Sequence, residues 1–395
     1  MNVKSYLYYI KLAILVLPLV ILLTITFHVD GGKSLMSRAI LISTLASLFF
    51  FRKEIDIKWL VNKNTLFFSS SVVIFTFYLA CHLLRGDEFS LPRTLLLSLV
   101  YLIVIPWHLI PRTWFYIFFA LGAIWAGSAS IYEHFFLHIS RVGVTVNPIP
   151  YALYCAGLAM ICFCLVMKTR VNKLLSSLLW LGFIFAVCAL ILTSVRGVML
   201  FLPVVLIITF LTMTRTKLIG LVKIIACMLC SAVIIYAIFD KQIEQRIDAT
   251  KSEVLAIMQG NMGTSIGARF VMWQHGIALI KAKPILGVGA VAQYDYVYKT
   301  MGIYKAEHLH NQYIDTAVKY GMVGLILTLF WLFSTLLVIK HRRLGIHFNP
   351  VLFSLLLLYL LAGLTDTPLH HTHMVYFYTL VAGIFLYLDS GQKLE

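Results

Sequence analysis

The residues best suited to chemistry lie in one polar segment, 308-HLHNQYIDTAVKYGMVG-324. His310 is a candidate general base, because an imidazole changes its charge near neutral pH and can take a proton from an attacking hydroxyl group. Asn311 follows it directly, and Gly321 and Gly324 come at the start of the next apolar run. The segment therefore predicts a site of proton transfer with His310 as its catalytic residue.

A second histidine, His308, lies two residues before His310, and in an extended segment the two side chains would share a face. A histidine pair can bind zinc, but Glu307, Asp315 and the histidines near residue 370 do not complete a recognised ligand spacing. We therefore expect neither a metal nor a cofactor here. A histidine at a helix start can also be structural, so orienting the substrate or packing the loop is the alternative role of His310.

Two arginines suit a phosphate-bearing substrate. Arg196 stands in 192-LTSVRGVML-200 between two apolar runs, where a charge near membrane depth is costly and usually functional. Its alternative role is to extend its guanidinium group to the outer lipid headgroups. Arg269 lies four residues before Trp273, on the same face if that segment is helical. Guanidinium groups pair bidentately with phosphate oxygens, so two converging arginines would suit a pyrophosphate.

The segment that carries Arg269 has the end signals of a helix. Thr264 or Ser265 is a suitable N-cap, and Pro284 stops the helix after about Lys283. The next residues, 284-PILGVGA-290, predict a glycine-rich turn whose backbone could approach a ligand or another chain closely, and a purely structural turn is the alternative.

Apart from these polar segments, the sequence is typical of a membrane protein. The whole chain has 61% apolar and only 12% charged residues. Apolar runs recur at about the length that crosses ~30 Å of hydrocarbon, and no alternating barrel pattern appears, so they predict helices. We expect an all-α polytopic membrane protein with about twelve spans. The spans are 8–28, 37–51, 66–84, 94–110, 114–135, 150–168, 177–195, 197–213, 219–239, 318–339, 350–365 and 372–388.

The net charge of +16 has a topological explanation. Lysine and arginine accumulate in short cytoplasmic loops, and alternate loops of this chain carry most of them, so both termini are expected in the cytoplasm. Residues 1–239 would then hold spans one to nine, 240–317 a large outer loop with the active-site motifs, and 318–395 the last three spans and a short tail. In a Gram-negative cell the loop faces the periplasm. Membrane lipid, and no nucleic acid, is the expected partner.

Four motifs together resemble the O-antigen ligase family, the Wzy-C-type glycosyltransferases. They are Arg196 after Thr-Ser, Gly-Ala-Arg-x-x-x-Trp (Arg269, Trp273), Pro-x-x-Gly-x-Gly (Pro284, Gly287, Gly289) and His-Asn-x9-Gly-x-x-Gly (His310, Asn311, Gly321, Gly324). The last motif is the most specific, and the expected layout of spans around one large loop agrees with the family.

The resemblance implies a GT-C-like, inverting, metal-independent transferase at the outer face of the inner membrane. Its donor would be an undecaprenyl-pyrophosphate-linked O-antigen, and its acceptor a core sugar of lipid A–core. Arg196 and Arg269 would hold the pyrophosphate, and His310 would activate or orient the acceptor hydroxyl. Asp366, in 363-GLTDTPLHH-371, resembles an acidic position in the last outer loop of relatives.

Three alternatives remain. An O-antigen polymerase uses the same donor with a growing polymer as acceptor, but polymerases usually have two sizeable outer loops and one dominates here. A protein O-oligosaccharyltransferase has a pilin-type acceptor. A lipid-linked sugar flippase or transporter would also fit twelve spans, although the chain shows no matched halves or paired broken helices.

Overall fold

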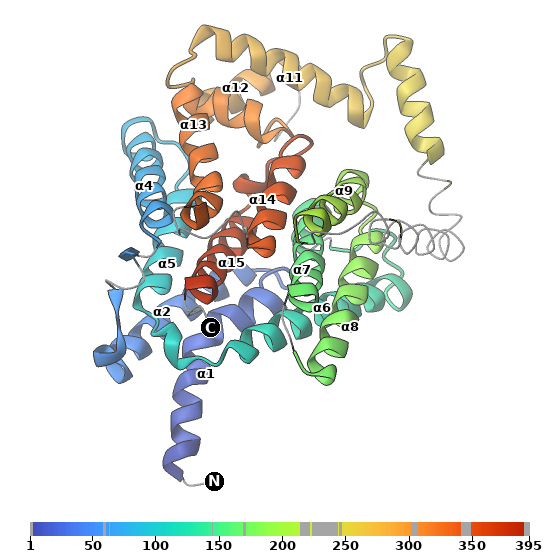
Figure 1. The fold of residues 1–395 in the computed structure, drawn as a ribbon. Coiled ribbons are helices and arrows are strands. Elements are labelled where there is room, and N and C mark those ends of the chain that lie inside the picture. The colour runs from blue at the N-terminus through green and yellow to red at the C-terminus, as the bar shows by residue number, and fades with distance from the viewer. Residues whose placement is uncertain are drawn as a thin grey trace. The chain divides into compact units, whose positions relative to one another are not determined.

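The computed structural model describes ten stretches of the chain and contains helices but no strands within them. The stretches are residues 3–57, 61–62, 64–143, 145–168, 171–213, 222, 244, 247–301, 307–340 and 349–390. The described chain divides into two compact units (Figure 1). The first comprises Met1–Leu202, Ile326–Ala362 and Pro368–Glu395, and the second comprises Pro203–Leu325 and Gly363–Thr367.

The first unit is a bundle of apolar helices (Figure 1). They form because backbone polar groups in hydrocarbon must be satisfied within the segment. The helices that lie wholly in it are α1 (Val3–Thr24), α2 (Gly32–Phe50), α4 (Thr65–Arg85), α5 (Ser90–Val104), α6 (Arg112–Phe135), α7 (Pro148–Lys168), α8 (Lys173–Leu192), α14 (Pro350–Ala362) and α15 (Thr372–Ser390).

Helix α7 is the core of this bundle. Every residue from Pro150 to Leu165 is buried, and α6, α8 and α14 pack against the helix. Buried hydroxyl and indole groups bond across helices. The Tyr154 hydroxyl donates to the Leu23 carbonyl at 2.6 Å, and the Trp331 Nε1–H donates to Ser71 Oγ at 2.9 Å. Such bonds fix which helices are neighbours, since an unpaired polar group in an apolar interior is costly.

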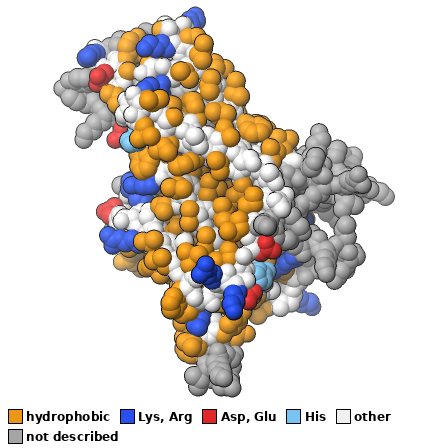
Figure 2. Space-filling view, turned by 90° about the vertical axis from the view of Figure 1, so that its left-hand side faces the viewer, with side chains coloured by type: hydrophobic (Ala, Val, Ile, Leu, Met, Phe, Trp, Pro, Cys, Tyr) orange, Lys and Arg blue, Asp and Glu red, His pale blue; other side chains and the backbone are white. Residues whose placement is uncertain are grey.

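The outward face of the helices is apolar. On α2, Leu41, Leu45 and Phe49 are 56%, 57% and 82% exposed. Figure 2 shows one side of the molecule, on which hydrophobic side chains form broad areas of the described surface. A protein in water rarely exposes such continuous apolar area, so this surface suits lipid.

The expectation of a helical polytopic membrane protein is confirmed, while the number of spans stays a prediction. Eight described helices are long and apolar enough to cross a membrane, and α5 and α14 are shorter apolar helices. The eight are Tyr6–Thr24, Gly32–Phe50, Thr65–Arg85, Arg112–Phe135, Pro148–Lys168, Lys173–Leu192, Arg196–Met213 and Gln312–Leu337. The expected span 219–239 lies almost wholly outside the described residues.

The second unit contains α11 (Ser265–Ala282), α12 (Ala290–Met301) and the first part of α13 (Gln312–Lys340). The expected ends of α11 are confirmed. Thr264 Oγ1 accepts the Gly267 N–H at 3.0 Å, and the helix ends two residues before Pro284. Met272 of α11, Val297 of α12, Leu309 and Val318 form the buried apolar cluster that joins these helices.

Helix α13 is broken at Gly321, whose φ of 69° and ψ of −173° are not helical. Backbone groups of the glycine-rich turn form hydrogen bonds with the backbone of α13 on both sides of this break. The N–H groups of Met322 and Val323 donate to the carbonyls of Pro284 and Ile285 at 2.8 and 3.2 Å, and those of Val288 and Gly289 donate to the carbonyls of Val318 and Lys319 at 2.8 and 3.0 Å. Groups that an intact helix would pair internally are thus paired with the turn.

Two glycines permit these hydrogen bonds between the turn and α13. A side chain at Gly321 would collide with the Ile285 carbonyl, and its positive φ is strained for any other residue. A Cβ at Gly287 would lie 2.5 Å from the Val318 carbonyl oxygen. The turn therefore approaches the beginning of α13 closely, which agrees with the structural alternative.

Candidate functional site

The histidine segment is anchored on both sides of His310. The Leu309 N–H donates to Asp315 Oδ1 at 3.0 Å, and the Leu309 carbonyl accepts the Trp273 Nε1–H at 2.9 Å. On the other side, Asn311 Oδ1 caps α13 by accepting the N–H groups of Tyr313 and Ile314, both at 3.0 Å. These bonds hold the backbone of His310 at a positive φ of 48°, which few non-glycine residues adopt.

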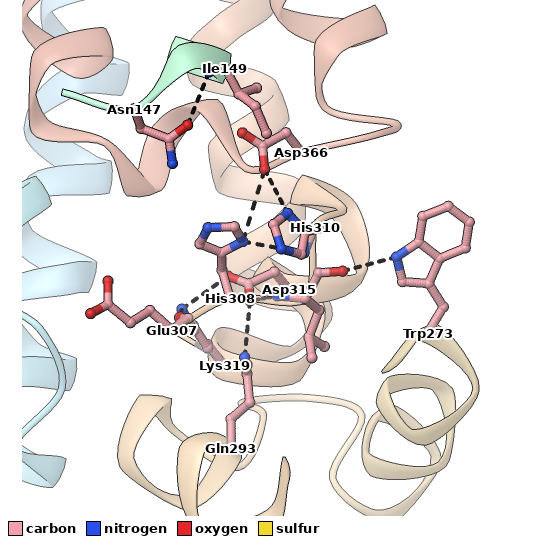
Figure 3. A network of polar contacts seen from close by, with 11 residues as sticks. Asn147, Ile149, Trp273, Gln293, Glu307, His308, His310, Asp315, Lys319 and Asp366 are labelled. Carbon is pink, nitrogen blue, oxygen red and sulfur yellow. Dashed lines mark hydrogen bonds and ion pairs between the residues drawn. The ribbon is translucent and has the colours of Figure 1, made fainter. Parts of the chain in front are cut away.

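The strained backbone directs the imidazole of His310 toward Asp366 (Figure 3). His310 Nδ1 lies 3.0 Å from Asp366 Oδ1, and because an ionised carboxylate can only accept, the Nδ1–H is the donor of this hydrogen bond. The Asp366 side chain is only 4% exposed and that of His310 is 32% exposed, so the carboxylate is buried behind a ring that reaches the surface. Strain of this kind gathers at functional sites.

His308 lies against the same carboxylate. Its Nδ1 is 3.9 Å from Asp366 Oδ1 and accepts the backbone N–H of His310 at 3.3 Å. The two imidazole rings meet edge to face with centroids 4.3 Å apart. A neutral His308 that accepts at Nδ1 carries its own proton on Nε2.

The segment that contains Asp366 is fixed to the start of α13. The Gln312 N–H donates to the carbonyls of Gly363 and Asp366 at 2.8 and 3.0 Å, and Asn311 Nδ2 donates to the Leu364 carbonyl at 3.2 Å. An N–H in the first turn of a helix has no partner within the helix, so a neighbouring segment can take it. Residues 310 and 366 are therefore held together by backbone as well as by side chains.

A buried ion pair between Asp315 and Lys319 adjoins the histidine segment (Figure 3). Lys319 Nζ lies 3.0 Å from Asp315 Oδ2, and Gln293 Nε2 donates to Asp315 Oδ1 at 3.0 Å. Asp315 and Lys319 are each 3% exposed. A buried pair that loses one partner leaves an uncompensated charge, so this pair constrains α12 and α13 together. The pair was not predicted from the sequence, although an acidic and a basic residue four apart are its signal.

The arrangement can perform general-base chemistry. The hydrogen bond from Nδ1–H to Asp366 fixes the tautomer of His310. It leaves the Nε2 lone pair as the proton acceptor. The buried carboxylate stabilises the imidazolium that forms when Nε2 takes a proton. His308, His310 and Asp366 also offer three donor atoms within 4.8 Å of one another, a set that could hold a metal ion.

The structure distributes the other predicted residues over both units. In the second unit, the Trp273 indole contacts the Leu309 backbone, and half-buried Arg269 lies one turn earlier on α11. Gly321 makes the break in α13, and Gly324 is buried just after it. Arg196 begins α9 (Arg196–Met213) in the first unit.

The connection before Arg196 has its own support. Helix α8 ends at Leu192, and Ser194 has a positive φ of 55°. Arg141 Nε donates to the Thr193 carbonyl at 3.2 Å, which satisfies an acceptor at the helix end. The two apolar runs around Arg196 are thus separate helices.

Comparisons with known proteins agree with the motifs. Residues 181–329, which include Arg196, Arg269 and His310, match the family model described as O-antigen ligase. The chain is 27% identical over 304 residues to an uncharacterized protein of Haemophilus influenzae, covering 73% of this chain and 75% of that protein. It is 26% identical over 174 residues to the O-antigen ligase of Escherichia coli, covering 40% of each chain. These matches and the four motifs support the O-antigen ligase family for this chain.

Proposed function

We propose that the protein is an O-antigen ligase that transfers an undecaprenyl-pyrophosphate-linked polysaccharide to a sugar of lipid A–core. The observation that carries the proposal is the hydrogen bond from His310 Nδ1 to Asp366, which leaves Nε2 to accept a proton at the surface of the second unit. The family match supports the same reaction class.

In the proposed reaction a hydroxyl oxygen of the core sugar attacks the anomeric carbon of the donor. The bond between that carbon and the pyrophosphate oxygen breaks, and undecaprenyl pyrophosphate leaves with the bonding electrons. The hydroxyl proton passes to His310 Nε2, and Asp366 stabilises the resulting imidazolium. A single displacement of this kind inverts the anomeric centre, and no step is assigned to a metal.

Arg196 and Arg269 are proposed to bind the donor. Each guanidinium can pair with two phosphate oxygens, and the pairing strengthens as the leaving group gains charge. Arg269 is suited to this role because the next turn of α11 contacts the histidine segment through Trp273. The active site is proposed to face the periplasm, with the protein in the inner membrane and both termini in the cytoplasm.

An O-antigen polymerase or a protein O-oligosaccharyltransferase would use the same donor and the same base with another acceptor. The lipopolysaccharide of a deletion strain separates these functions. Loss of a ligase leaves lipid A–core without polymer and accumulates lipid-linked polymer. Loss of a polymerase still allows one repeat unit to be attached, and loss of a flippase leaves the lipid-linked unit on the inner leaflet. Lipopolysaccharide that carries one repeat unit would contradict ligase function.

A further inference from the structure

The cluster of His308, His310 and Asp366 has the geometry of a transition-metal site. Two of its donor distances are 3.0 Å, from His310 Nδ1 to Asp366 Oδ1, and 3.9 Å, from His308 Nδ1 to the same oxygen, and all three donors lie within 4.8 Å of one another. A tetrahedral zinc ion with bonds of ~2.1 Å separates its ligands by ~3.4 Å. The donors therefore surround a position that an ion can occupy after small shifts.

The chemistry of the donors selects the class of ion. Two imidazole nitrogens and one carboxylate oxygen suit zinc and its neighbours cobalt and nickel, whereas magnesium and calcium prefer oxygen ligands alone. Three protein ligands also leave a fourth position for water, as in open zinc sites. His310 is 32% exposed, so solvent reaches this side of the cluster.

The backbone already holds two of the ligands in place. Leu309 and Asn311, on either side of His310, are anchored by hydrogen bonds, and the Asp366 segment is bonded to the start of α13. His308 Nδ1 accepts the His310 N–H at 3.3 Å, so its single lone pair must leave that hydrogen bond before it can bind an ion. The ordering that the ion must impose is therefore largely confined to the His308 ring.

We propose that the cluster binds a divalent zinc-class cation through His308 Nδ1, His310 Nδ1 and one Asp366 carboxylate oxygen, and that the bound ion inhibits the enzyme. Binding at His310 Nδ1 requires a lone pair there, so the proton on Nδ1 must move to Nε2. That tautomer presents N–H to the substrate and has lost the acceptor that the base needs. For neutral rings and an ionised carboxylate the exchange releases no net proton.

The proposal of metal binding depends only on the geometry of the cluster, whereas the proposal of inhibition also rests on the proposed function. The two parts are therefore measured separately. Binding is followed on the purified full-length protein in detergent by the visible ligand-field absorption of Co²⁺, a spectroscopic substitute for zinc, with displacement by Zn²⁺. Inhibition is followed as the fraction of each protein's own metal-free transfer rate that remains in Zn²⁺, with recovery on adding a chelator.

Three variants define the test. His308→Gln and Asp366→Asn each remove one ligand, and the amide oxygen introduced by His308→Gln can still accept the His310 N–H, so the segment is expected to fold. His275→Gln is the control, because His275 lies on α11 and contacts Tyr296 outside the cluster. We expect wild type and the control to bind one Co²⁺ equally, and both ligand variants to bind it more than ~10-fold more weakly. Melting temperatures without metal identify any variant that has not folded.

The site is overturned if wild type gives no ligand-field band, if folded His308→Gln and Asp366→Asn bind Co²⁺ as wild type does, or if His275→Gln also loses the band. If the wild-type protein transfers but binds no metal, the proposed metal site is wrong and the proposed function stands. Metal binding without any transfer activity supports the site while the proposed function fails. If the wild-type protein binds Zn²⁺ and still transfers at its full metal-free rate, the inhibition is overturned.

Discussion

Asp366 Oδ1 accepts a hydrogen bond from His310 Nδ1–H at 3.0 Å, although the two residues are 56 positions apart in the sequence. The carboxylate is buried, and its partner is the residue held at positive φ between two anchored neighbours. The pair fixes which imidazole nitrogen is left to accept a proton. An aspartate in this position supports the base and does not itself take the proton.

Asp366→Asn is expected to lower the transfer rate by about 10²–10⁴-fold, the usual contribution of general-base catalysis. An asparagine can present its NH₂ group to Nδ1, which favours the tautomer with its proton on Nε2. The measurement is the single-turnover rate of purified enzyme. Asp295→Asn is the matched control, since Asp295 is an exposed acid on α12, and it should keep the wild-type rate. Equal rates for the two variants would show that Asp366 has no part in catalysis.

Arg269→Ala is expected to lower transfer by about 10²–10³-fold, the cost of removing one charge-assisted contact from a transition state. Arg196→Ala should have a similar effect. Arg269→Lys keeps the charge but not the planar fork, so it should recover only part of the rate. Lys281→Ala, an exposed change on the same helix, is the control. Full activity of folded Arg269→Ala would remove Arg269 from the donor site.

Gly321→Ala is expected to destabilise the second unit by more than the ~1–3 kcal/mol that a left-handed backbone costs a non-glycine residue, because the new side chain also meets the Ile285 carbonyl. Gly260→Ala provides the control. Its φ is also positive, at 85°, but nothing lies within 4 Å of the added Cβ. The difference in melting temperature between the two variants isolates the collision. If both melt alike, the turn does not constrain α13 in solution.

The topology can be tested by single cysteines placed in a background without the native seven. A cysteine at Lys299 should react with an impermeant maleimide in cells with a permeabilised outer membrane, because the basic residues predict a periplasmic loop. A cysteine at Lys173 should react only after the inner membrane is broken. The reverse pattern would invert the proposed orientation.

Much of the fold follows from local signals that the sequence displays. Apolar runs of spanning length predict most of the helices, and Thr264 and Pro284 predict the ends of α11, because caps and breakers act within one turn. The glycines of 284–290 predict a close backbone approach. Their partner, the break at Gly321, is not predictable, because spacing says nothing about which distant backbone groups will exchange hydrogen bonds.

The sequence alone selects His310 as the candidate base but says less about the residues that hold it. His310 and Asn311 stand in a recognisable motif, whereas Asp366 entered only through the resemblance to a family, since a contact over 56 residues leaves no trace in local spacing. The pairing of Asp315 with Lys319 is visible as an i, i+4 pair, but its burial depends on α12 packing over it and on Gln293 reaching Asp315.

The most direct test of the general base compares His310→Gln with wild type, using purified enzyme, lipid-linked donor and lipid A–core acceptor. Glutamine is polar and of similar size but cannot take a proton, so transfer is expected to fall by about 10²–10⁴-fold with little change in melting temperature. His275→Gln should keep the wild-type rate. Transfer by folded His310→Gln at a rate near that of wild type would contradict general-base catalysis and leave His310 an orienting or packing residue.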